Sequence, residues 1–365
     1  GRNLDAALAC AISTLLLLTT ANALPLTSVA GPTGVVRFTY LGSGCAAIWE
    51  QGWPLVALVL GLQGIALPLL HFCLLIAALT AVRLKTRPRW VGSVFRYAQH
   101  LDLWAMSDVL LLGGIIGYGR VATSIPVHVE PGGWCLIAGA LLTMLTRASL
   151  DRRAFWRRIE EPPERVFKRS VACLDCNLVL PANLRHCPRC GAHLYRRKPF
   201  AQLRTNALVA ACFLLLPVAN YFPASTLWEG QEAEPHTIFD GIRLLFQTGY
   251  APVGLLVFCT SMAIPLLKLV SLIWFSISMK SRSRRYLRLK TRLYRMINVA
   301  GRWSNLDPFT VAVFTPMIQF EPLAHINVGG GAPAFLALII LSMIAVRVFD
   351  PRLMWDAAGI TSGVR

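Results

Sequence analysis

Long apolar runs, separated by short polar and basic segments, dominate the chain. The runs long enough to suggest membrane-spanning helices lie at about Leu4 to Leu24, Trp53 to Val82, Leu103 to Tyr118, Gly133 to Thr146, Asn206 to Phe222, Tyr250 to Met279, Trp303 to Ile318 and Ala332 to Val348. A perpendicular crossing needs about 20 residues, so the third, fourth and seventh runs need flanking residues or a thinner bilayer. The pattern predicts an all-α polytopic membrane protein with eight spans.

The composition agrees with a membrane protein rather than a soluble basic one. The 365 residues include 36 Lys plus Arg and 18 Asp plus Glu, a net charge of +18, but only 15% are charged and 55% are hydrophobic. The mean hydropathy is +0.54. A disordered basic segment that binds nucleic acid would be poor in Leu, Ile and Val. These values therefore predict no nucleic-acid partner.

The basic residues predict the orientation of the chain. With eight spans, residues 83–96, 147–204, 280–302 and 347–365 hold 5, 14, 9 and 3 Lys or Arg, whereas the loops on the opposite side hold only Arg37, Arg120 and Arg243. Basic loops are retained in the cytoplasm, so we expect both termini to be cytoplasmic. Binding of anionic lipid headgroups is an alternative role for the runs at 83–89 and 280–285, although topology alone accounts for them.

An internal repeat divides the chain, because residues 4 to 158 are matched by residues 204 to 357. The matched pairs, 197 to 199 residues apart, are Asn22-x-x-Pro25 with Asn220-x-x-Pro223, Gly44 and Gly52 with Gly241 and Gly249, Pro68-Leu69-Leu70 with Pro265-Leu266-Leu267, Trp104-x-x-x-Asp108 with Trp303-x-x-x-Asp307, and Asp151-x-Arg153-x-x-Trp156 with Asp350-x-Arg352-x-x-Trp355. Four spans per half is an even number, so the two halves enter from the same side and form a parallel repeat. The predicted parts are a four-helix half at 1–158, an insert at 159–203, and a second four-helix half with a short tail at 204–365.

The insert contains two closely spaced pairs of cysteines. Cys173-x-x-Cys176 is followed after ten residues by Cys187-Pro-x-Cys190. Two such knuckles supply the tetrahedral sulfur cage of a structural zinc site. An insert of this size cannot build its own core, so bound metal would contribute its folding free energy. Zinc fits a cytoplasmic insert best, with an iron centre or a redox dithiol as alternatives, and His186 and His193 as possible substitute ligands.

The other six cysteines show no paired spacing. They are Cys10, Cys45, Cys73, Cys135, Cys212 and Cys259. Most have the character of ordinary apolar residues. Cys45 and Cys135 both fall near the predicted outer face, where a disulfide is chemically possible but is not fixed by the sequence.

Ionisable residues inside the predicted spans are candidates for function. Each costs about 2.5–3.5 kcal/mol at a helix centre and needs a compensating role. The candidates form repeat-related pairs: Lys268 with His71, Asp307 with Asp108, and Ser342 with Thr143. A Lys, an Asp and a hydroxyl in one half could act as a proton relay. The alternative is a static polar lock that joins helices.

Two elements are expected on the outer side. Residues 35–40, Val-Val-Arg-Phe-Thr-Tyr, are β-prone and form a strand that a partner's edge could extend. The segments Gly44 to Gly52 and Gly241 to Gly249 carry apolar residues at helical spacing, which predicts interfacial helices. These helices would serve as anchors or as a lateral lipid gate.

Taken together, these motifs resemble the paraquat-inducible protein A family. The similarity covers nearly the whole chain and is especially specific in Gly301-Arg302-Trp303-Ser304-x-Leu306-Asp307 and Asp350-x-Arg352-Leu353-x-Trp355-Asp356. The resemblance implies an inner-membrane protein of a Gram-negative bacterium that moves phospholipids. Its partner would be a periplasmic protein of the mammalian-cell-entry (MCE) type, whose hexameric rings form a hydrophobic tunnel. Such a system supports the outer membrane.

The chain is not expected to be an enzyme. It lacks the Gly-x-x-x-x-Gly-Lys-Ser/Thr loop that binds nucleotide phosphates, so energy would come from protons, ions or a partner. Two other classes remain open at this stage. The chain could be a structural anchor that seats the tunnel without active transport, or a membrane protein that senses redox state or metal.

Overall fold

The computed structural model describes residues 2–30, 36–84, 88–121, 126–159, 170–229, 232–247, 249–320 and 324–360. The helices are α1 (Arg2–Ala23), α2 (Ser43–Glu50), α3 (Pro54–Gly61), η1 (Leu62–Ala66), α4 (Leu67–Ala81), α5 (Val91–Leu101), α6 (Ser107–Val121), α7 (Pro131–Ser149), α8 (Arg152–Ile159), α9 (Ala201–Tyr221), α10 (Ile238–Gln247), α11 (Ala251–Phe258), η2 (Cys259–Ala263), α12 (Ile264–Lys280), α13 (Leu287–Ala300), η3 (Gly301–Asn305), α14 (Leu306–Phe314), η4 (Thr315–Ile318), α15 (Gly331–Val348) and α16 (Arg352–Ala357). The strands are β1 (Thr27–Ala30), β2 (Val36–Thr39), β3 (Val127–Val129), β4 (Ser170–Ala172), β5 (Val179–Pro181), β6 (Ser225–Glu229), β7 (Glu232–His236), β8 (Gln319–Phe320) and β9 (Ala324–Val328).

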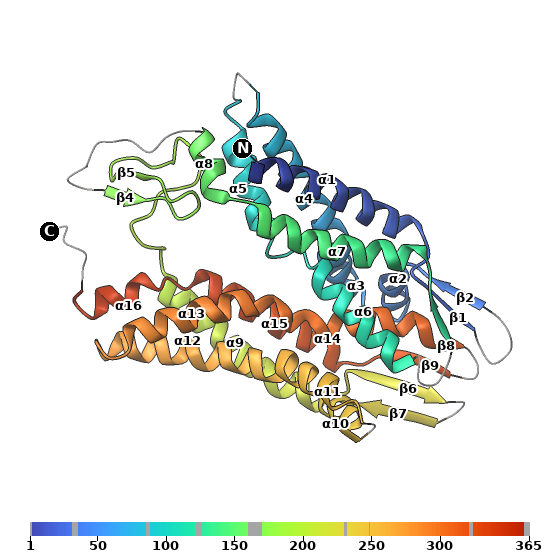
Figure 1. Ribbon diagram of the computed structural model, residues 1–365. Coiled ribbons are helices and arrows are strands. Elements are labelled where there is room, and N and C mark those ends of the chain that lie inside the picture. Colours follow the sequence, from blue (N-terminus) through green and yellow to red (C-terminus); the bar gives the residue numbers. More distant parts are fainter. Residues whose placement is uncertain are drawn as a thin grey trace.

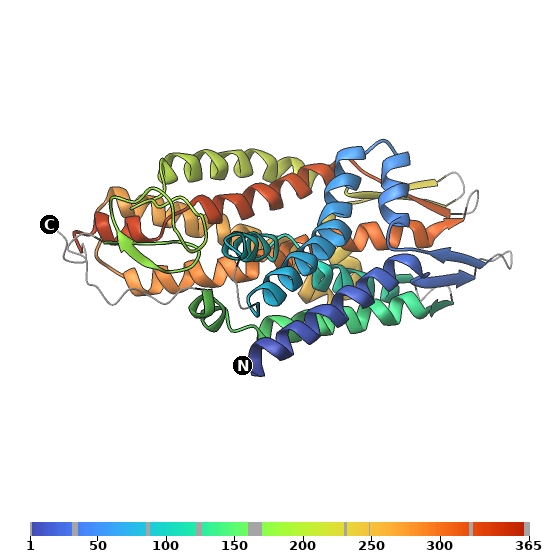
Figure 2. The same cartoon turned by 90° about the horizontal axis from the view of Figure 1, so that it is seen from above.

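The helices form two layers, one from each half of the chain. Helices α1 to α8 make the upper layer of Figure 1 and α9 to α16 the lower one, with α6 and α14 packed against each other between them. The insert with β4 and β5 lies at the same end as the C-terminus, and the other sheets lie at the opposite end (Figures 1 and 2). We call this insert the ribbon. We call the two ends of the molecule the ribbon end and the sheet end.

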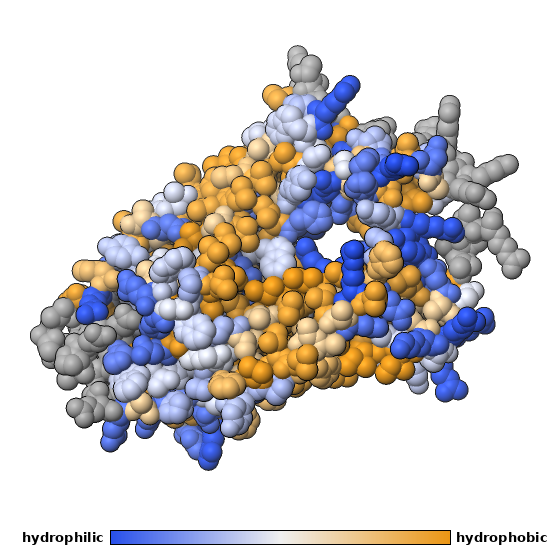
Figure 3. Space-filling model, turned by 180° about the vertical axis from the view of Figure 1, so that it is seen from behind, coloured by the Kyte–Doolittle hydropathy of each residue, from blue (hydrophilic) through white to orange (hydrophobic). Residues whose placement is uncertain are grey.

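Five described helical segments are long and apolar enough to cross a membrane. They are Leu4–Ala23, Pro54–Ala81, Ala201–Tyr221, Ala251–Lys280 and Gly331–Val348, and the bent pair α7 and α8 makes a sixth if it counts as one span. All of them coincide with predicted runs. In Figure 3 hydrophobic residues cover the middle of the molecule, while hydrophilic ones gather toward its ends. The chain is therefore a mostly helical, multi-pass membrane protein.

The third and seventh predicted runs do not form full-length helices. Helix α6 has 15 residues, about 22 Å at 1.5 Å per residue and less than the roughly 30 Å of a hydrocarbon core, while the seventh run is divided among η3, the 9-residue α14 and η4. Both pack inside the protein, where Val109, Leu306 and Phe309 are buried. An element covered by protein does not have to match the bilayer thickness, which explains their short length.

A π-helical turn interrupts the long second helix of each half. The turns η1 and η2 end two residues before Pro68 and Pro265. Proline has no N–H, and its ring clashes with the carbonyl four residues earlier, so a widened turn lets the helix continue past it. His71 and Lys268 each follow the proline by three residues, so the widened turns set the positions of both side chains.

Three small sheets are present in addition to the predicted helices, so the description all-α is incomplete. Strands pair in the orders β2-β1-β3, β4-β5 and β7-β6-β9-β8. The predicted strand at residues 35–40 is confirmed over β2, Val36–Thr39, and Val35 lies outside the described residues. The helices expected at 44–52 and 241–249 are confirmed as α2 and α10.

Equivalent positions of the two halves make equivalent contacts. Gly132 N donates to Pro25 O at 3.0 Å, and Gly331 N donates to Pro223 O at 2.9 Å. These bonds tie the start of each half's last helix to the end of its first. Between the halves, Asn305 Nδ2 donates to Met106 Sδ at 2.8 Å, and these two residues are 199 positions apart. That separation is the same as the spacing of the sequence repeat.

Candidate functional site

The four cysteines of the insert converge on one buried point. The Sγ atoms of Cys173, Cys176, Cys187 and Cys190 all lie within 4.8 Å of one another, with Cys173–Cys190 at 3.6 Å and Cys176–Cys187 at 3.5 Å. A tetrahedral metal with bonds of about 2.3 Å to sulfur would space its ligands by about 3.8 Å. The four thiols therefore fit a tetrahedral metal ion such as zinc.

Each cysteine pair sits on a turn whose backbone geometry is set by the next residue. Asn177 and Gly191 follow the second cysteines and have positive φ values of 58° and 68°, which Asn and Gly adopt most readily. Their N–H groups donate to Cys173 O at 3.1 Å and Cys187 O at 2.8 Å. The turns thus direct both sulfurs of each pair to the same side. The two residue types are the ones that this turn requires.

His186 and His193 do not belong to the thiol cluster. Their Nε2 atoms lie 3.0 Å apart, and both rings are on the exposed surface of the ribbon. The group of potential metal ligands among the described residues contains the four cysteines and neither histidine. The four sulfurs already complete a tetrahedral set, so substitution by histidine is not needed.

The ribbon contacts both halves of the chain. On the first half, Arg189 O lies so close to Gly92 that a Cβ there would be 1.8 Å from it, and Ser93 Oγ donates to Cys190 O at 3.4 Å. On the second half, Arg197 Nη2 donates to Asp356 Oδ1 at 2.8 Å, and this hydrogen bond raises the pKa of the Arg197 guanidinium. The four-cysteine centre therefore joins the two layers at the ribbon end.

Lys268 is fully buried in the second half and is surrounded by oxygen atoms. Its Nζ donates to Gly301 O at 3.0 Å, Ser304 Oγ at 3.1 Å and Ser342 Oγ at 3.2 Å. An ammonium group has three N–H donors, so these three acceptors, from η3 and α15, account for all of them. The prediction that Lys268 and Ser342 lie together is consistent with this contact. Ser304 was missed, although it stands in the Gly-Arg-Trp-Ser motif.

The expected pairing of Lys268 with Asp307 is not among the described contacts of Lys268. The acceptors of the ammonium are a carbonyl and two hydroxyls, whereas Asp307 lines a separate small cavity with Ile48 and Ala332. Asp307 opens α14 while Ser304 belongs to the preceding 3₁₀ turn η3. The change in helical twist between these two elements could not be inferred from sequence spacing.

The first-half residues form a different cluster, built on ion pairs. Asp108, with 1% of its surface exposed, accepts from Arg147 Nη1 at 2.8 Å, and Arg147 Nε donates to Asp102 Oδ1 at 2.8 Å. His71 Nδ1 lies 2.8 Å from Ala98 O, and its Nε2 lies 3.8 Å from Asp102 Oδ1. The structure thus brings His71 and Asp108 to one network. The sequence analysis did not identify Arg147 and Asp102 as members of this network. Their opposite charges, at the ends of neighbouring apolar runs, were the feature that could have indicated the ion pair.

Thr143 takes a smaller part in this cluster. Its Oγ1 donates to Gly139 O of its own helix at 2.9 Å, and it lines a cavity of about 20 Å³ together with His71 and Arg147. That space is enough for about one water molecule. Thr143 therefore lies next to the first-half cluster, but the described bond of its hydroxyl is within α7.

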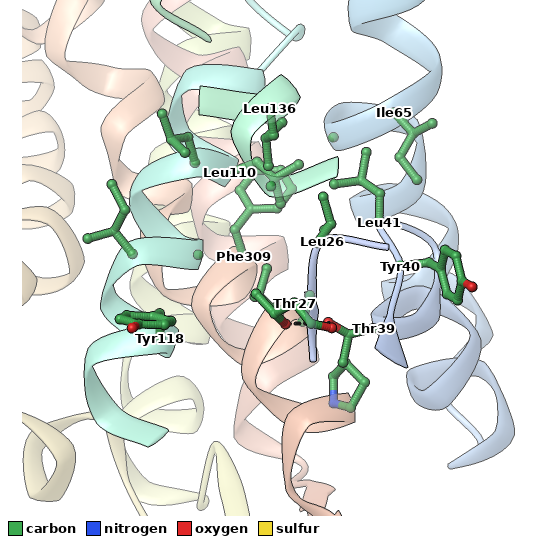
Figure 4. Close-up of a pocket in the computed structure, with 18 of the residues that line it drawn as sticks. Leu26, Thr27, Thr39, Tyr40, Leu41, Ile65, Leu110, Tyr118, Leu136 and Phe309 are labelled. Atoms are coloured by element: carbon green, nitrogen blue, oxygen red, sulfur yellow. Dashed lines mark hydrogen bonds between the residues drawn. The ribbon is translucent and has the colours of Figure 1, made fainter. Parts of the chain in front are cut away.

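An apolar pocket of about 160 Å³ lies toward the sheet end of the first half. Its wall is almost entirely hydrocarbon, including Leu110, Leu136 and Phe309 (Figure 4). Hydroxyl groups occur at one side, where Thr27 Oγ1 and Thr39 Oγ1 lie 2.6 Å apart. The pocket is therefore amphipathic, with a long apolar surface and a polar edge.

Cys45 lines this pocket, and it is a free thiol, as is Cys135. The structure therefore contains no Cys45–Cys135 disulfide. Helix α6, which carries Leu110 and Ile115, and helix α14, which carries Phe309, both contribute to the wall. The pocket is thus built at the junction between the two halves rather than within one helix bundle.

The fold and these sites define a multi-pass helical membrane protein with a ribbon whose four buried thiols could hold a metal ion, and with an apolar pocket. The sequence model of the family described as "Paraquat-inducible protein A" matches residues 4–160 and 203–359. The chain belongs to this family.

Curated relatives agree with this assignment. The chain is 30% identical over 300 residues to the Escherichia coli K12 protein named "Intermembrane transport protein PqiA", covering 78% of this chain and 71% of the relative. It is 31% identical over 265 residues to the E. coli K12 "Lipophilic envelope-spanning tunnel protein A", covering 71% and 61%. A Haemophilus influenzae "Probable intermembrane transport protein" is 23% identical over 327 residues, covering 85% and 78%. No solved structure matches the chain.

Proposed function

We propose that this protein moves phospholipids between the inner membrane and a periplasmic tunnel formed by an MCE-type partner. The observation that carries the proposal is the amphipathic pocket: its apolar wall suits an acyl chain, and its hydroxyl edge at Thr27 and Thr39 suits the ester or headgroup region. The names of the relatives, which refer to intermembrane transport and to an envelope-spanning tunnel, also support the proposed function.

Filling the pocket tests the proposal. Ile115 lines the pocket and is 53% exposed, so Ile115→Trp adds an indole at its mouth without forcing a bulky group into the core. We expect this variant to co-purify with several-fold less phospholipid, measured by mass spectrometry, and to lose complementation of an envelope-permeability defect.

The matched control is Leu16→Trp on α1. Leu16 is 64% exposed and does not line the pocket, so it adds a similar indole to the apolar surface alone. Equal lipid content and equal complementation for the two variants would rule out the pocket as the lipid site.

The architecture in this proposal is a parallel repeat of two four-helix halves, residues 1–158 and 204–365, around the ribbon at 159–203. Three observations support it: the family model matches two segments of equal length, the π-helical turns fall at equivalent positions, and Asn305 bonds its repeat mate Met106. A contact between equivalent positions is what a twofold axis between the halves produces. In this arrangement α6 and α14 are the short third spans.

The proposed orientation places the ribbon and both termini in the cytoplasm, because 14 of the 36 basic residues fall in residues 147–204. A membrane-impermeant thiol reagent applied to intact cells is expected to label Glu232→Cys and not Arg288→Cys. Both sites are exposed, and native cysteines outside the ribbon would first be replaced. Labelling of Arg288→Cys without cell lysis would overturn the orientation.

The metal that we assign to Cys173, Cys176, Cys187 and Cys190 is zinc in a structural role. Four thiolates leave no open coordination position for substrate, and when bound the ion supplies folding free energy to a segment with only two three-residue strands. The ribbon's contacts with both halves are consistent with this role.

The proposed coupling site is the Lys268 cluster. A buried lysine surrounded by neutral oxygens can change its protonation state when its surroundings change, whereas the first-half Asp108–Arg147 pair is held as a stable ion pair. We therefore assign proton-coupled movement to Lys268, Ser304 and Ser342, and a locking role to Asp108. His71 and Thr143 adjoin that lock, and no coupling role is assigned to Asp307.

A further inference from the structure

A second and larger cavity, of about 880 Å³, lies at the ribbon end. It is formed between α8, the end of α5 and the first cysteine knuckle, and its lining includes four arginines, Arg152, Arg153, Arg157 and Arg189. The apolar pocket, in contrast, lies toward the sheet end and has no charged residue among the described residues of its lining.

The charge in this cavity is strongly unbalanced. Asp175 is the one acidic residue among the described residues of its lining, and its carboxylate lies 3.4 Å from His100 Nε2. Arg152 reaches Asp102 at 3.3 Å, but Arg153 and Arg157 have no ion pair among the described residues. Among the described residues, the lining of the cavity therefore keeps an excess of positive charge.

The two unpaired arginines are held on one face of a fixed helix. Arg153 and Arg157 are four positions apart on α8, so their side chains are neighbours, and like charges at this spacing repel. The opposite face of α8 is anchored, because the ring of buried Phe155 stacks on Phe95 at 3.7 Å and Trp156 packs edge-on against Phe95 at 5.1 Å. The helix is held in this orientation, so an anion placed between the two guanidinium groups would interact favourably with both.

The lining also offers polar groups suited to an oxyanion. Gln99 and Asn177 carry amide donors into the same wall, and guanidinium groups form paired hydrogen bonds with phosphate oxygens. Retention of basic loops in the cytoplasm explains why arginines are frequent in this segment. It does not explain why four of them, from α8 and from the ribbon, line one concave space.

We propose that this cavity is a binding site for a phosphate-bearing anion, with Arg153 and Arg157 as its principal ligands. This anion is either the headgroup of an anionic phospholipid or a soluble phosphate compound. A headgroup is within reach because α8 follows the membrane helix α7 after a bend of 59°, which places the cavity near the membrane surface. The inference does not depend on the proposed transport function.

Binding to the purified full-length protein in a non-ionic detergent tests the proposal. The probes are dihexanoyl phosphatidylglycerol, dihexanoyl phosphatidylcholine and inorganic phosphate, each titrated by calorimetry. The wild type is expected to bind at least one anionic probe saturably, and the double variant Arg153→Gln with Arg157→Gln is expected to bind it about tenfold more weakly or worse, because hydrogen bonds between charged groups are lost.

The matched control is Arg288→Gln with Arg292→Gln on α13, which removes the same charge from exposed positions outside the cavity. Its affinity should stay within twofold of the wild type. Arg157→Lys provides a second variant that keeps the charge and should fold even if the double variant does not; loss of the paired geometry should still weaken binding several-fold.

The binding measurements distinguish a lipid headgroup from a soluble phosphate compound as the bound anion. Saturable binding of phosphatidylglycerol without binding of inorganic phosphate assigns the cavity to a lipid headgroup, and comparable binding of inorganic phosphate assigns it to a soluble compound. Three results would overturn the proposal: no saturable binding of either anion, equal weakening in the control double variant, or unchanged affinity in the cavity variants.

Discussion

Replacement of Cys173, Cys176, Cys187 and Cys190 by serine is expected to remove close to one zinc ion per chain and to lower the amount of folded protein sharply. Structural zinc in small peptides contributes roughly 10–16 kcal/mol of binding free energy that appears as folding free energy. The ribbon has little else to fold on, because β4 and β5 have three residues each. Elemental analysis of purified protein and its abundance in membranes measure the two effects.

The same substitutions should also loosen the contact between the halves. The ribbon meets the first half at Gly92 and Ser93 and the second half at Asp356, so its unfolding removes a connection at that end. Limited proteolysis between residues 159 and 203 should therefore become faster. Specific transport per remaining folded molecule is expected to fall less than abundance does.

The control for the metal prediction uses the neighbouring histidines. His186→Ser with His193→Ser changes two potential ligands next to the cluster while leaving all four thiols in place. Metal content should be unchanged in this variant. If instead the serine replacements at the four cysteines left the metal content as it was, the assignment of the site would be wrong.

The parts of this structure that follow from local pattern could be predicted from the sequence. Continuous apolar runs predicted the long helices, because a run of that length in lipid must satisfy its own backbone hydrogen bonds. The cysteine spacing predicted the sulfur cluster, since a Cys-x-x-Cys knuckle is itself a local structure. The grouping of Lys268 with Ser342 as relay candidates came from the repeat, which gives each of them a mate in the first half, His71 and Thr143.

The parts that depend on contacts between distant segments could not be predicted. Strands β1 and β3 pair across about 100 residues, with Thr27 opposite Val129, and no periodicity within three or four residues reveals such a partner. The choice of Ser304 rather than Asp307 beside Lys268 depends on the twist of η3 against α14. The ion pair of Arg147 with Asp108 joins α7 to α6, and its members were separately interpreted as a topology signal and a relay residue.

The burial of α6 and α14 at the junction between the halves is another feature that could not be predicted. The apolar runs at 103–118 and 303–318 have the composition of spans, but composition alone does not distinguish a helix that faces lipid from one that is covered by protein. Only the packing of α6 on α14 shows that their apolar residues are used to join the halves and to line the pocket.

Replacing Lys268 by methionine is expected to abolish transport while leaving the protein as stable as the wild type or more stable. The side chain is completely buried and its ammonium is held by neutral oxygens alone among its described contacts, so it pays a desolvation cost without an opposite charge to offset it. Methionine has a similar volume and no charge. Ser342 keeps its bond to Ile339 O at 2.7 Å, and Gly301 O and Ser304 Oγ are the two acceptors that lose the ammonium.

Lys290→Met is the matched control for this prediction. Lys290 is also buried, hydrogen-bonds to Ser278 and lies over the ring of Trp274 at 5.2 Å, but it is outside the Lys268 cluster. It should retain transport, so the pair distinguishes loss of a particular ammonium from loss of any buried lysine.

The two variants are compared by thermal unfolding in detergent, by abundance in membranes and by complementation of an envelope-permeability defect. For Lys268→Met we expect an unfolding free energy that is unchanged or raised by up to about 4 kcal/mol, the range found when buried ion pairs are replaced by apolar residues, together with complementation close to that of the empty vector. A static polar lock predicts the reverse: because a lock only joins helices, its removal would lower stability, and whatever protein folded would still transport. Full complementation by a normally abundant Lys268→Met protein would show that this lysine is a packing residue and that the energy of transport enters elsewhere.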